Sequence, residues 1–589
     1  MITRNASTPH RPGAPRVNRL LLHAFLLLAG WGLWWRFGRG TPWYSTQLIV
    51  LGLQTGLASI PSINRWLSLQ FDKARFPTPR SRTITATTIS MLGMIYLFIS
   101  AVQQERDRFP KYHDESMHLI QAQQLARARL WMPAHALPQF FETFHVFVTP
   151  VYAAMQFPGT SMLYIPGIWL HLPYWVTSIA IAGASLGLFY YVIAQLIDGI
   201  AGILAAMMLL GVLEFRYLSV MVLSNPAVML LGLLTLCAWI RWRMHQSPHS
   251  AILIGIFAGW AAITRPPDAL CFALPVGVSM MWTLRHSVRK TLIAGVCLVF
   301  GALPFLSIQL IFNHGVTRQW FTSPHEAYVK AFHPGGAYGP HAESIHERPQ
   351  THLAQKLDYY DGFVAREIGR YHPSTALELW TSERLPILFK ASLPSLLLLL
   401  FLPSGLLGLH HGQRWIPFAI CPLFISLYAF SVFFASQYCL LNTVTLIPMA
   451  ILGVRQFEIT FRNRSRQIST ATTVCLMSLC FTQLPQFNPG ITEQYESKTL
   501  SAVEARLHEI KGRAVVFFHY QHHDNVHEEP VYNIDSADID SSRIVRAQDL
   551  GAAENLKLIR YYAERQPDRQ VYLFNRATRV LIPLGPVTQ

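Results

Sequence analysis

Charged side chains are scarce in this sequence. Asp, Glu, Lys and Arg together make up 14% of the 589 residues, whereas 51% of the residues are hydrophobic. A typical soluble domain carries about 25% charged residues. The shortage of charge excludes an ordinary soluble domain and indicates a chain that folds largely inside a lipid bilayer.

Cysteine is also rare, and it is confined to apolar runs. None of the seven cysteines falls in a hydrophilic segment, which excludes a disulfide framework there. The sequence has no CxxC pair and no Cys/His spacing typical of a structural metal site. Small core residues are the simplest role for the seven cysteines, which are Cys237, Cys271, Cys297, Cys421, Cys439, Cys475 and Cys480.

The sequence also lacks a nucleotide-binding motif and a signal-peptide cleavage site. No GxxxxGK[ST] motif is present, so the sequence predicts no nucleotide-binding P-loop. The first apolar run is followed by Trp34, Trp35 and Arg36 and not by small residues. We therefore expect no cleavable signal peptide.

Long apolar runs are what the chain has in abundance. About thirteen runs approach the roughly 20 residues needed to cross about 30 Å of hydrocarbon. The runs lie at 19–37, 45–64, 84–103, 174–195, 198–213, 225–242, 251–264, 269–284, 291–312, 386–408, 415–435, 438–454 and 469–485. They predict a polytopic membrane protein.

The net charge of +16 follows the expected membrane topology. With the N-terminus in the cytoplasm, basic residues concentrate in segments on the inner side, which is the positive-inside bias. This explains the basicity without a nucleic-acid partner. The inner segments are 1–18, 65–83, 241–249, 285–290 and 455–466, and the long hydrophilic segments 104–173 and 313–385 fall outside, as does the tail after 486.

Three regions follow from these patterns. Residues 1–83 form an N-terminal arm with two spans, 84–485 form the main bundle, and 486–589 form a soluble C-terminal domain outside the cytoplasm. The predicted fold class is an all-α polytopic bundle with interfacial helices in its outside loops and a small C-terminal α/β domain. Strands are expected at 514–518, 542–547 and 570–574, and a helix at 550–564.

The segment KYHDESMHLIQAQQLARARLWMP (111–133) carries the main chemical signal. From residue 116 to 131 it predicts an amphipathic helix that lies along the outer membrane surface. Asp114 and Glu115 can cap this helix at its positive end, or they can serve catalysis or metal binding. Adjacent helical residues do not face each other, so the two carboxylates should have different partners. His118 shares a face with Asp114.

Other charged groups also gather at the outer ends of spans. LEFRYLSVMVLSNP (213–226) carries Glu214 and Arg216, and AITRPPDAL (262–270) carries Arg265 and Asp268. Ionisable groups near the membrane core are costly and usually line a cavity or a site. The sequence therefore predicts one polar site on the outer side of the bundle.

The order of these features resembles a known family. An Asp-Glu pair after an early span, the QLARARLW helix, the Pro-Gly return in QFPGTSMLYIPG (156–167) and the later TRPPDAL are similar to the GT-C membrane glycosyltransferases. Within these, the pattern is most similar to glycosyltransferase family 39, which includes protein O-mannosyltransferases and the lipid A aminoarabinose transferases. The resemblance covers roughly 84–320. Two extra N-terminal spans and the pair Gln156 and Phe157, where relatives often have Tyr and Pro, depart from it.

This resemblance implies transfer of a sugar from a polyprenyl-phosphate donor at the outer face of the cytoplasmic membrane. Asp114 matches the catalytic base or metal-associated acid of the first loop, with Glu115 beside it, and Glu214 matches a further acid. Arg265 is expected to pair with the lipid phosphate. The residues expected to bind substrate are His118, Arg216, Arg265, Asp268, Arg318 and Tyr328. The acceptor can be a lipid, a glycan or a protein.

Two later segments add candidates. The histidine- and tyrosine-rich loop 313–385 includes Arg318, His325 and Tyr328, and such long loops often cover a site. HYQHHDNVHEE (519–529) is compatible with a metal site, but an exposed polar loop is the favoured interpretation. A divalent metal ion stays open as a cofactor, since no ligand set is defined.

Two other functions compete with glycosyl transfer. A transporter or lipid flippase would usually show charges within the membrane or broken helices in paired halves, whereas these charges lie at the outer ends. A non-catalytic membrane scaffold would leave Asp114 dispensable.

Overall fold

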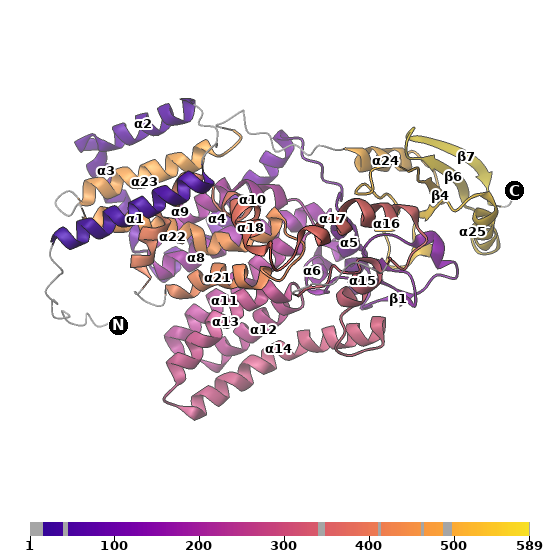
Figure 1. The fold of residues 1–589 in the computed structure, drawn as a ribbon, viewed down its shortest axis with the longest axis horizontal. Coiled ribbons are helices and arrows are strands. Elements are labelled where there is room, and N and C mark those ends of the chain that lie inside the picture. Colours follow the sequence, from indigo (N-terminus) through magenta and orange to yellow (C-terminus); the bar gives the residue numbers. More distant parts are fainter. Residues whose placement is uncertain are drawn as a thin grey trace.

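Helices form most of the molecule, as the apolar runs predict (Figure 1). A computed structural model describes residues 16–38, 45–339, 348–409, 414–460, 465–486, 498–522 and 524–587. In this part of the chain, six helical segments are long and apolar enough to cross a membrane. They are α4 (Pro79–Gln103), α8 (Tyr174–Leu196), α11 (Ser224–His245), α13 (Pro266–Leu284), α14 (Val288–Thr317) and Ser436–Gln456, which combines η6 (Ser436–Asn442) with most of α22 (Thr443–Thr460).

The remaining apolar runs also fold as helices, but these are shorter or bent. Ala376–Ser392 and Leu396–Gly408 meet at 103° and could form one broken span. The shorter apolar helices are α1 (Arg16–Phe37), α2 (Ser45–Ser59), α9 (Gly199–Gly211), α12 (Pro248–Ala262), α21 (Trp415–Tyr428) and α23 (Ser465–Thr482). Every predicted run therefore coincides with helix, whereas thirteen crossings stay a prediction.

Short helices connect these elements. They are α3 (Pro61–Arg75), α5 (His113–Ala126), η1 (Pro138–Phe141), α6 (Gly159–Met162), α7 (Ile165–Trp169), α10 (Leu213–Leu218), α15 (Pro324–Phe332), α16 (Ala354–Tyr359), η2 (Tyr360–Val364), α17 (Ala365–Arg370), α18 (Ala376–Leu379), η3 (Trp380–Arg384), α19 (Leu385–Ser392), η4 (Leu396–Phe401), α20 (Leu402–Gly405) and η5 (Leu406–Gly408). The predicted run 45–64 is divided, because α2 ends at Ser59 and Pro61 starts α3.

The N-terminal helices α1 and α2 pack on the bundle. Helix α1 packs against η4 and α20, and α2 lies along α23. These partners belong to the last part of the bundle, so α1 and α2 extend its surface (Figure 1).

Helices α12, α13 and α14 project from the bundle together (Figure 1). The 30 residues of α14 span about 45 Å at 1.5 Å per residue, more than the hydrocarbon thickness. Small residues let α12 and α14 approach closely: a Cβ on Gly255 would lie 2.2 Å from the Leu298 carbonyl oxygen, and one on Gly301 would lie 2.3 Å from that of Ile252.

Ion pairs tie together the segments that the sequence assigns to the inner side. Asp198, which caps α9, binds Arg455 at 2.5 Å and lies 3.8 Å from Arg75. Arg414 donates to the Leu196 carbonyl in the same region. Segments far apart in the sequence therefore meet at one end of the bundle, as the charge distribution predicts.

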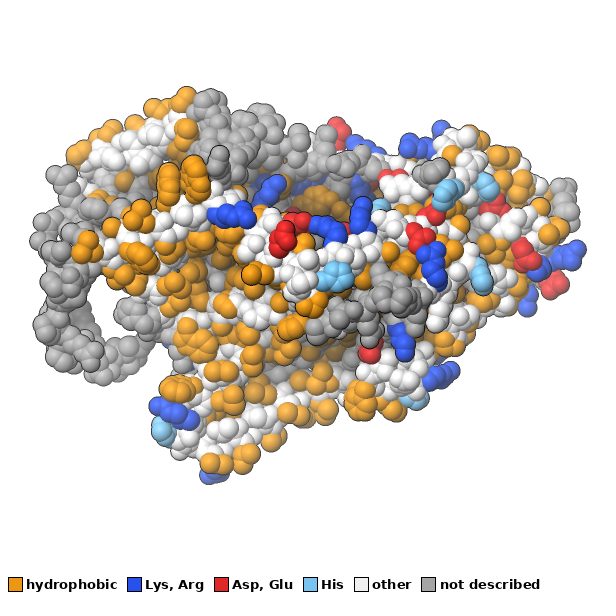
Figure 2. Space-filling view, viewed as in Figure 1, with side chains coloured by type: hydrophobic (Ala, Val, Ile, Leu, Met, Phe, Trp, Pro, Cys, Tyr) orange, Lys and Arg blue, Asp and Glu red, His pale blue; other side chains and the backbone are white. Residues whose placement is uncertain are grey.

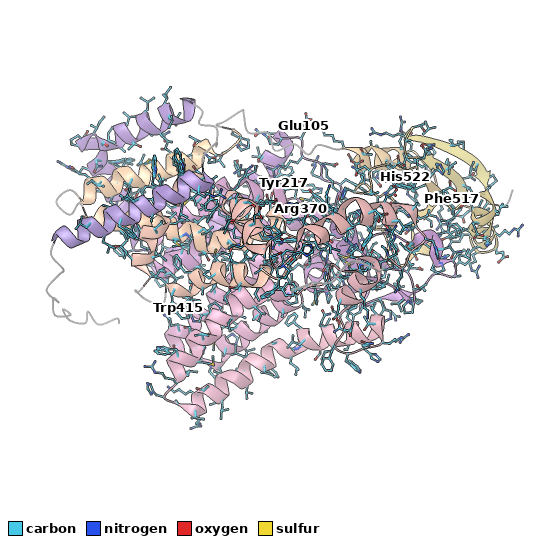
Figure 3. All side chains as sticks on the ribbon, in the orientation of Figure 1. Glu105, Tyr217, Arg370, Trp415, Phe517 and His522 are labelled. Atoms are coloured by element: carbon cyan, nitrogen blue, oxygen red, sulfur yellow. The ribbon has the colours of Figure 1, made fainter. Side chains whose placement is uncertain are left out.

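The loops 104–173 and 313–385 meet at the other end of the bundle, beside the C-terminal domain (Figure 1). The first loop forms a small antiparallel sheet of β1 (Met132–Pro133), β3 (Val151–Ala154) and β2 (Val146–Phe147), in that order. In Figure 3, Trp415 lies within the bundle, whereas His522 and Phe517 lie at the C-terminal domain.

The C-terminal domain is the predicted α/β fold. Its sheet has the order β5 (Ile544–Gln548), β4 (Ala514–His519), β6 (Gln570–Asn575) and β7 (Val580–Pro586). Strand β4 is parallel to β5 and β6, and β7 is antiparallel to β6. Helices α24 (Thr499–His508) and α25 (Ala552–Arg565) accompany the sheet, with a turn of 3-10 helix, η8 (Ile539–Ser541). The sequence prediction missed α24 and β7.

This domain shares a core with the first loop. Buried Met117 and Ile120 of α5, Phe140 of the loop and Phe517 of β4 belong to one hydrophobic cluster. The rings of Phe140 and Phe517 lie 6.1 Å apart. The domain is thus docked on the bundle, and it is not an independent appendage.

Surface composition follows the same division. Hydrophobic side chains cover much of the helical part in Figure 2, whereas charged and histidine side chains gather over the connecting loops and the C-terminal domain. Exposed apolar residues of α14 include Leu292, Val296, Val299 and Phe300. Such a continuous apolar face is expected where a helix contacts lipid.

Substitutions at two glycines of α14 test the close packing of α14 against α12. Gly301→Ala should lower the free energy of unfolding by about 1–3 kcal/mol, because the new methyl group collides with the α12 backbone. Gly295→Ala is the matched control on the same helix, where nothing lies within 4 Å of the added atom. Thermal unfolding in detergent, followed by fluorescence, measures both, and equal midpoints would contradict the packing argument.

Candidate active site

Helix α5 is anchored at its first turn by a buried carboxylate. Glu115, only 2% exposed, accepts backbone N–H groups of Lys111 at 3.0 Å and Tyr112 at 3.4 Å through Oε1. Its Oε2 accepts the N–H of Val222, just before α11, at 2.9 Å. The capping role predicted for the acidic pair therefore belongs to Glu115, which also ties α5 to α11.

Burial has an electrostatic consequence for this group. It raises the pKa of Glu115 to about 7, although the N–H groups of Lys111, Val222 and Tyr112 favour the ionised form. With every described contact of its carboxylate directed to backbone, Glu115 serves the geometry of α5.

The rest of α5 differs from the predicted surface helix. The helix ends at Ala126 and not at Trp131, and both of its faces are buried inside the protein. Its glutamine side chains donate hydrogen bonds inside the protein, Gln121 to the Gln156 carbonyl and Gln124 to that of Tyr152. The amphipathic pattern reflected internal hydrogen bonding, so the interfacial assignment for α5 was wrong.

Asp114 points away from Glu115, as the helical spacing predicts. Its Oδ1 lies 2.9 Å from Nδ1 of His145, which immediately precedes β2. The Asp114 side chain keeps 38% of its surface exposed although residues on both sides of it in α5 are buried. Asp114 is therefore the accessible member of the acidic pair.

Histidines set the charge of this carboxylate. Burial by itself would raise the pKa of Asp114, but the hydrogen bond to His145 and the nearby His118 and His113 hold it well below the usual range. Asp114 is therefore ionised at neutral pH. His118 is its neighbour but not its direct partner, because Nδ1 of His118 lies 3.3 Å from Oγ of Ser161.

The surrounding histidines are neutral at pH 7. Burial lowers the pKa of His118 and of His325 to about 4 and that of His333 to about 3, and it lowers the pKa of His113 well below its ordinary value. Asp114 acts in the opposite direction on each of them but does not outweigh burial. Asp114 is thus surrounded by these four uncharged imidazoles.

Aromatic rings complete the surroundings of His145. The Tyr328 hydroxyl accepts the backbone N–H of His145 at 2.8 Å, and its ring meets the imidazole edge-on at 5.9 Å. Tyr359 packs against His113 and His333. His325 stacks on Phe157 at 6.3 Å. Tyr328, predicted to bind substrate, is placed in the site as a support for His145.

Arg265 forms a second polar group at the start of α13. Its Nε donates to Oδ2 of the fully buried Asp268 at 2.6 Å, and its Nη atoms donate to Ser224 at 3.1 Å and Tyr428 at 2.8 Å. Tyr428 in turn donates to Asp268, and the ring of Tyr438 lies 4.6 Å from the guanidinium carbon. The Arg265 side chain is 20% exposed.

The two polar groups lie near the same two histidines. Both Asp114 and Arg265 influence the pKa values of His118 and His325, Asp114 raising them and Arg265 lowering them. These histidines therefore lie within electrostatic range of both groups. The structure brings together Asp114, His118, His325, Tyr328 and Arg265, which come from three distant parts of the chain.

Other predicted site residues have different surroundings. Glu214 of α10 accepts a hydrogen bond from Ser436 at 3.1 Å, and burial raises its pKa. Arg216 is buried, and its guanidinium donates to the Leu210 carbonyl. The backbone carbonyl of Arg216 accepts a hydrogen bond from Arg106. Arg318 is exposed, in a left-handed conformation at the C-terminus of α14. Substrate binding by these arginines stays a prediction.

Metal binding finds little support in the described part of the chain, where no group of three or more His, Cys, Asp and Glu side chains is arranged to hold a metal ion. In the segment 519–529, His519 pairs with Asp549, His522 with Asp358 and Glu529 with Arg576. Its His523 lies outside the described residues. All seven cysteines are free, as expected.

His145, His333, Tyr359 and Tyr438 were not predicted from the sequence. His145 lies in ETFHVFV, where nothing distinguishes it from a core histidine. Only its contact with Asp114, 31 positions earlier, gives it a role.

Comparisons with known proteins give limited guidance. No protein-family model and no curated protein matches the chain. Among solved structures, ArnT from Cupriavidus metallidurans bound to undecaprenyl phosphate is similar, with 10% identity, a TM-score of 0.48, and coverage of 84% of this chain and 93% of ArnT. The apo form of ArnT gives 12% identity, a TM-score of 0.38, and coverage of 81% and 92%. With TM-scores below 0.5, we base no assignment on either likeness.

The raised pKa of Glu115 predicts a pH-dependent stability difference. The folded protein binds the Glu115 proton more tightly than the unfolded chain, so this group's contribution to stability is largest below about pH 4.5 and declines until about pH 7. Across that window the wild type should lose on the order of 3 kcal/mol relative to Glu115→Gln. Unfolding midpoints of both proteins from pH 4.5 to 8 measure this, and a constant difference would contradict it.

Proposed function

We propose that the protein transfers a sugar from a polyprenyl-phosphate donor to an acceptor of the cell envelope. The observation that carries the proposal is the ionised and accessible Asp114, held by His145 and close to the same histidines, His118 and His325, as Arg265. Arg265 begins an apolar helix long enough to cross a membrane, so a lipid-borne substrate can reach this site from the bilayer.

The residue types fit the reaction. The acceptor hydroxyl attacks the anomeric carbon of the sugar, the bond from that carbon to the phosphate oxygen breaks, and the hydroxyl proton passes to Asp114. His145 orients this carboxylate and shares the proton. The leaving polyprenyl phosphate gains negative charge, which the guanidinium of Arg265 can stabilise.

The uncharged side chains around Asp114 are suited to binding a sugar. Uncharged imidazoles offer hydrogen-bond donors and acceptors without competing with Asp114 for charge, and tyrosine rings pack against the apolar faces of a pyranose. Placement at the outer face of the cytoplasmic membrane, with the N-terminus inside, is part of this proposal and rests on the basic inner segments. The acceptor class is left open.

Asp114→Asn tests the base. The substitution keeps the shape of the side chain but removes its charge, so kcat for transfer of radiolabelled sugar from a polyprenyl-phosphate donor should fall by about 10²–10⁴-fold. Asp361→Asn is the control, because Asp361 is exposed and paired with Arg348. Full transfer by a folded Asp114→Asn protein would refute this assignment of the base.

The same assay tests the role of Glu214 and distinguishes sugar transfer from transport. Glu214→Gln should retain most activity if Glu214 only holds Ser436, whereas a loss equal to that of Asp114→Asn would place Glu214 in the reaction. Absence of wild-type transfer from every lipid-linked sugar would favour a transporter or flippase.

Arg265→Lys tests the phosphate site. Lysine keeps the charge but cannot reproduce the three hydrogen bonds of the guanidinium to Asp268, Ser224 and Tyr428. The KM for the lipid donor should rise about tenfold, as expected from the loss of one charge-assisted hydrogen bond. Arg285→Lys at the exposed other end of α13 is the control, and an unchanged KM in Arg265→Lys would place the phosphate elsewhere.

A further inference from the structure

The C-terminal domain contacts the residues around Asp114 through one buried tyrosine. Tyr532, 4% exposed, lies between β4 and η8. Its hydroxyl lies 3.0 Å from Nδ1 of His113 and donates to the Phe144 carbonyl at 3.1 Å. One hydroxyl thus joins the last domain to the first turn of α5 and to the first loop.

His113 directly precedes Asp114 in that turn. Its ring stacks on Phe144 at 4.1 Å with an interplanar angle of 14°, and it meets His145 edge-on at 5.7 Å. From the C-terminal domain, His527 lies 6.4 Å away at 26°. His113 is therefore held between the first loop and the C-terminal domain, beside both members of the Asp114–His145 pair.

Other contacts fix the domain so that Tyr532 cannot shift freely. Asp540 lies 3.1 Å from Nε2 of His135 in the first loop. Gln548 donates to the Glu142 carbonyl at 3.0 Å and accepts a hydrogen bond from Gln355 at 2.8 Å. These anchors lie in separate parts of the interface, so the domain is held in both position and orientation.

We propose that Tyr532 is a positioning residue for the sugar transfer proposed above, and that the C-terminal domain thereby completes the active site. It fixes the His113 ring, and with it the first helical turn that directs the Asp114 carboxylate at His145. The inference rests on the proposed function for its catalytic meaning, while the link from Tyr532 to His113 can be measured without turnover.

Removing the hydroxyl would affect His113 in two ways. Nδ1 of His113 would lose its partner in a buried setting, where an unsatisfied polar group is unfavourable. The ring could then turn on Phe144 and compete with His145 for the Asp114 carboxylate. The direction of Asp114 and its proton affinity would both change, whereas the lipid phosphate contacts at Arg265 would not.

Tyr532→Phe in the full-length protein, reconstituted in lipid nanodiscs, tests this inference. We expect kcat for sugar transfer to fall on the order of tenfold, as for one hydrogen bond. The acid limb of the kcat–pH profile should move, and KM for the polyprenyl-phosphate donor should stay within twofold. Tyr520→Phe is the matched control, since it removes another hydroxyl contact of the same domain, and its kcat and pH profile should match those of the wild type.

A second measurement keeps the two proposals separate. Imidazole ¹⁵N chemical shifts of His113, assigned by comparison with His113→Gln, should change in Tyr532→Phe and not in Tyr520→Phe. If these shifts change while the wild type transfers no sugar, the proposed function fails and the structural link stands. An unchanged kcat and pH profile in Tyr532→Phe, with an active wild type, would overturn the positioning role, as would equal losses in both variants.

Discussion

The candidate site depends on one carboxylate that takes no direct part in the proposed chemistry. Glu115 holds three backbone N–H groups, two before α5 and one before α11, and so fixes both the start of the helix and its place in the bundle. Adjacent residues of a helix point in different directions, so Asp114, which precedes Glu115, is directed at His145. A buried acid satisfied by backbone thus orients an accessible one.

Few charged groups lie near Glu115 and Asp114. The positive charge of Arg265 is balanced by the buried Asp268 and shared with the hydroxyls of Ser224 and Tyr428. The histidines beside Asp114 are kept neutral by burial. An isolated charge in such surroundings would be very unfavourable. Arg265 is accordingly paired with Asp268, and Asp114 lies against His145. The other polar groups nearby are neutral hydrogen-bond donors and acceptors.

The sequence predicted the parts that depend on local pattern. Apolar runs became helices, and the strands at 514–518, 542–547 and 570–574 are present. The site roles of Asp114 and Arg265 stay predictions. What failed depended on distant partners. The polar residues of α5 suggested a membrane surface because the carbonyls of Gln156 and Tyr152, which satisfy them, cannot be foreseen from spacing. His145 and Tyr532 acquire their roles only through contacts formed by folding, and the Tyr532–His113 contact joins positions 419 apart.

That contact also bears on how the protein matures. His113 follows the first of the long apolar helices, whereas Tyr532 comes after all of the candidate spans. During synthesis the bundle can insert helix by helix, but the wall beside Asp114 stays open until the final domain has folded and docked. A chain still emerging from the ribosome would hold its acidic group without the surroundings that aim it. Insertion of the membrane part and completion of the surroundings of Asp114 are therefore separate events, with docking of the last domain as the step between them.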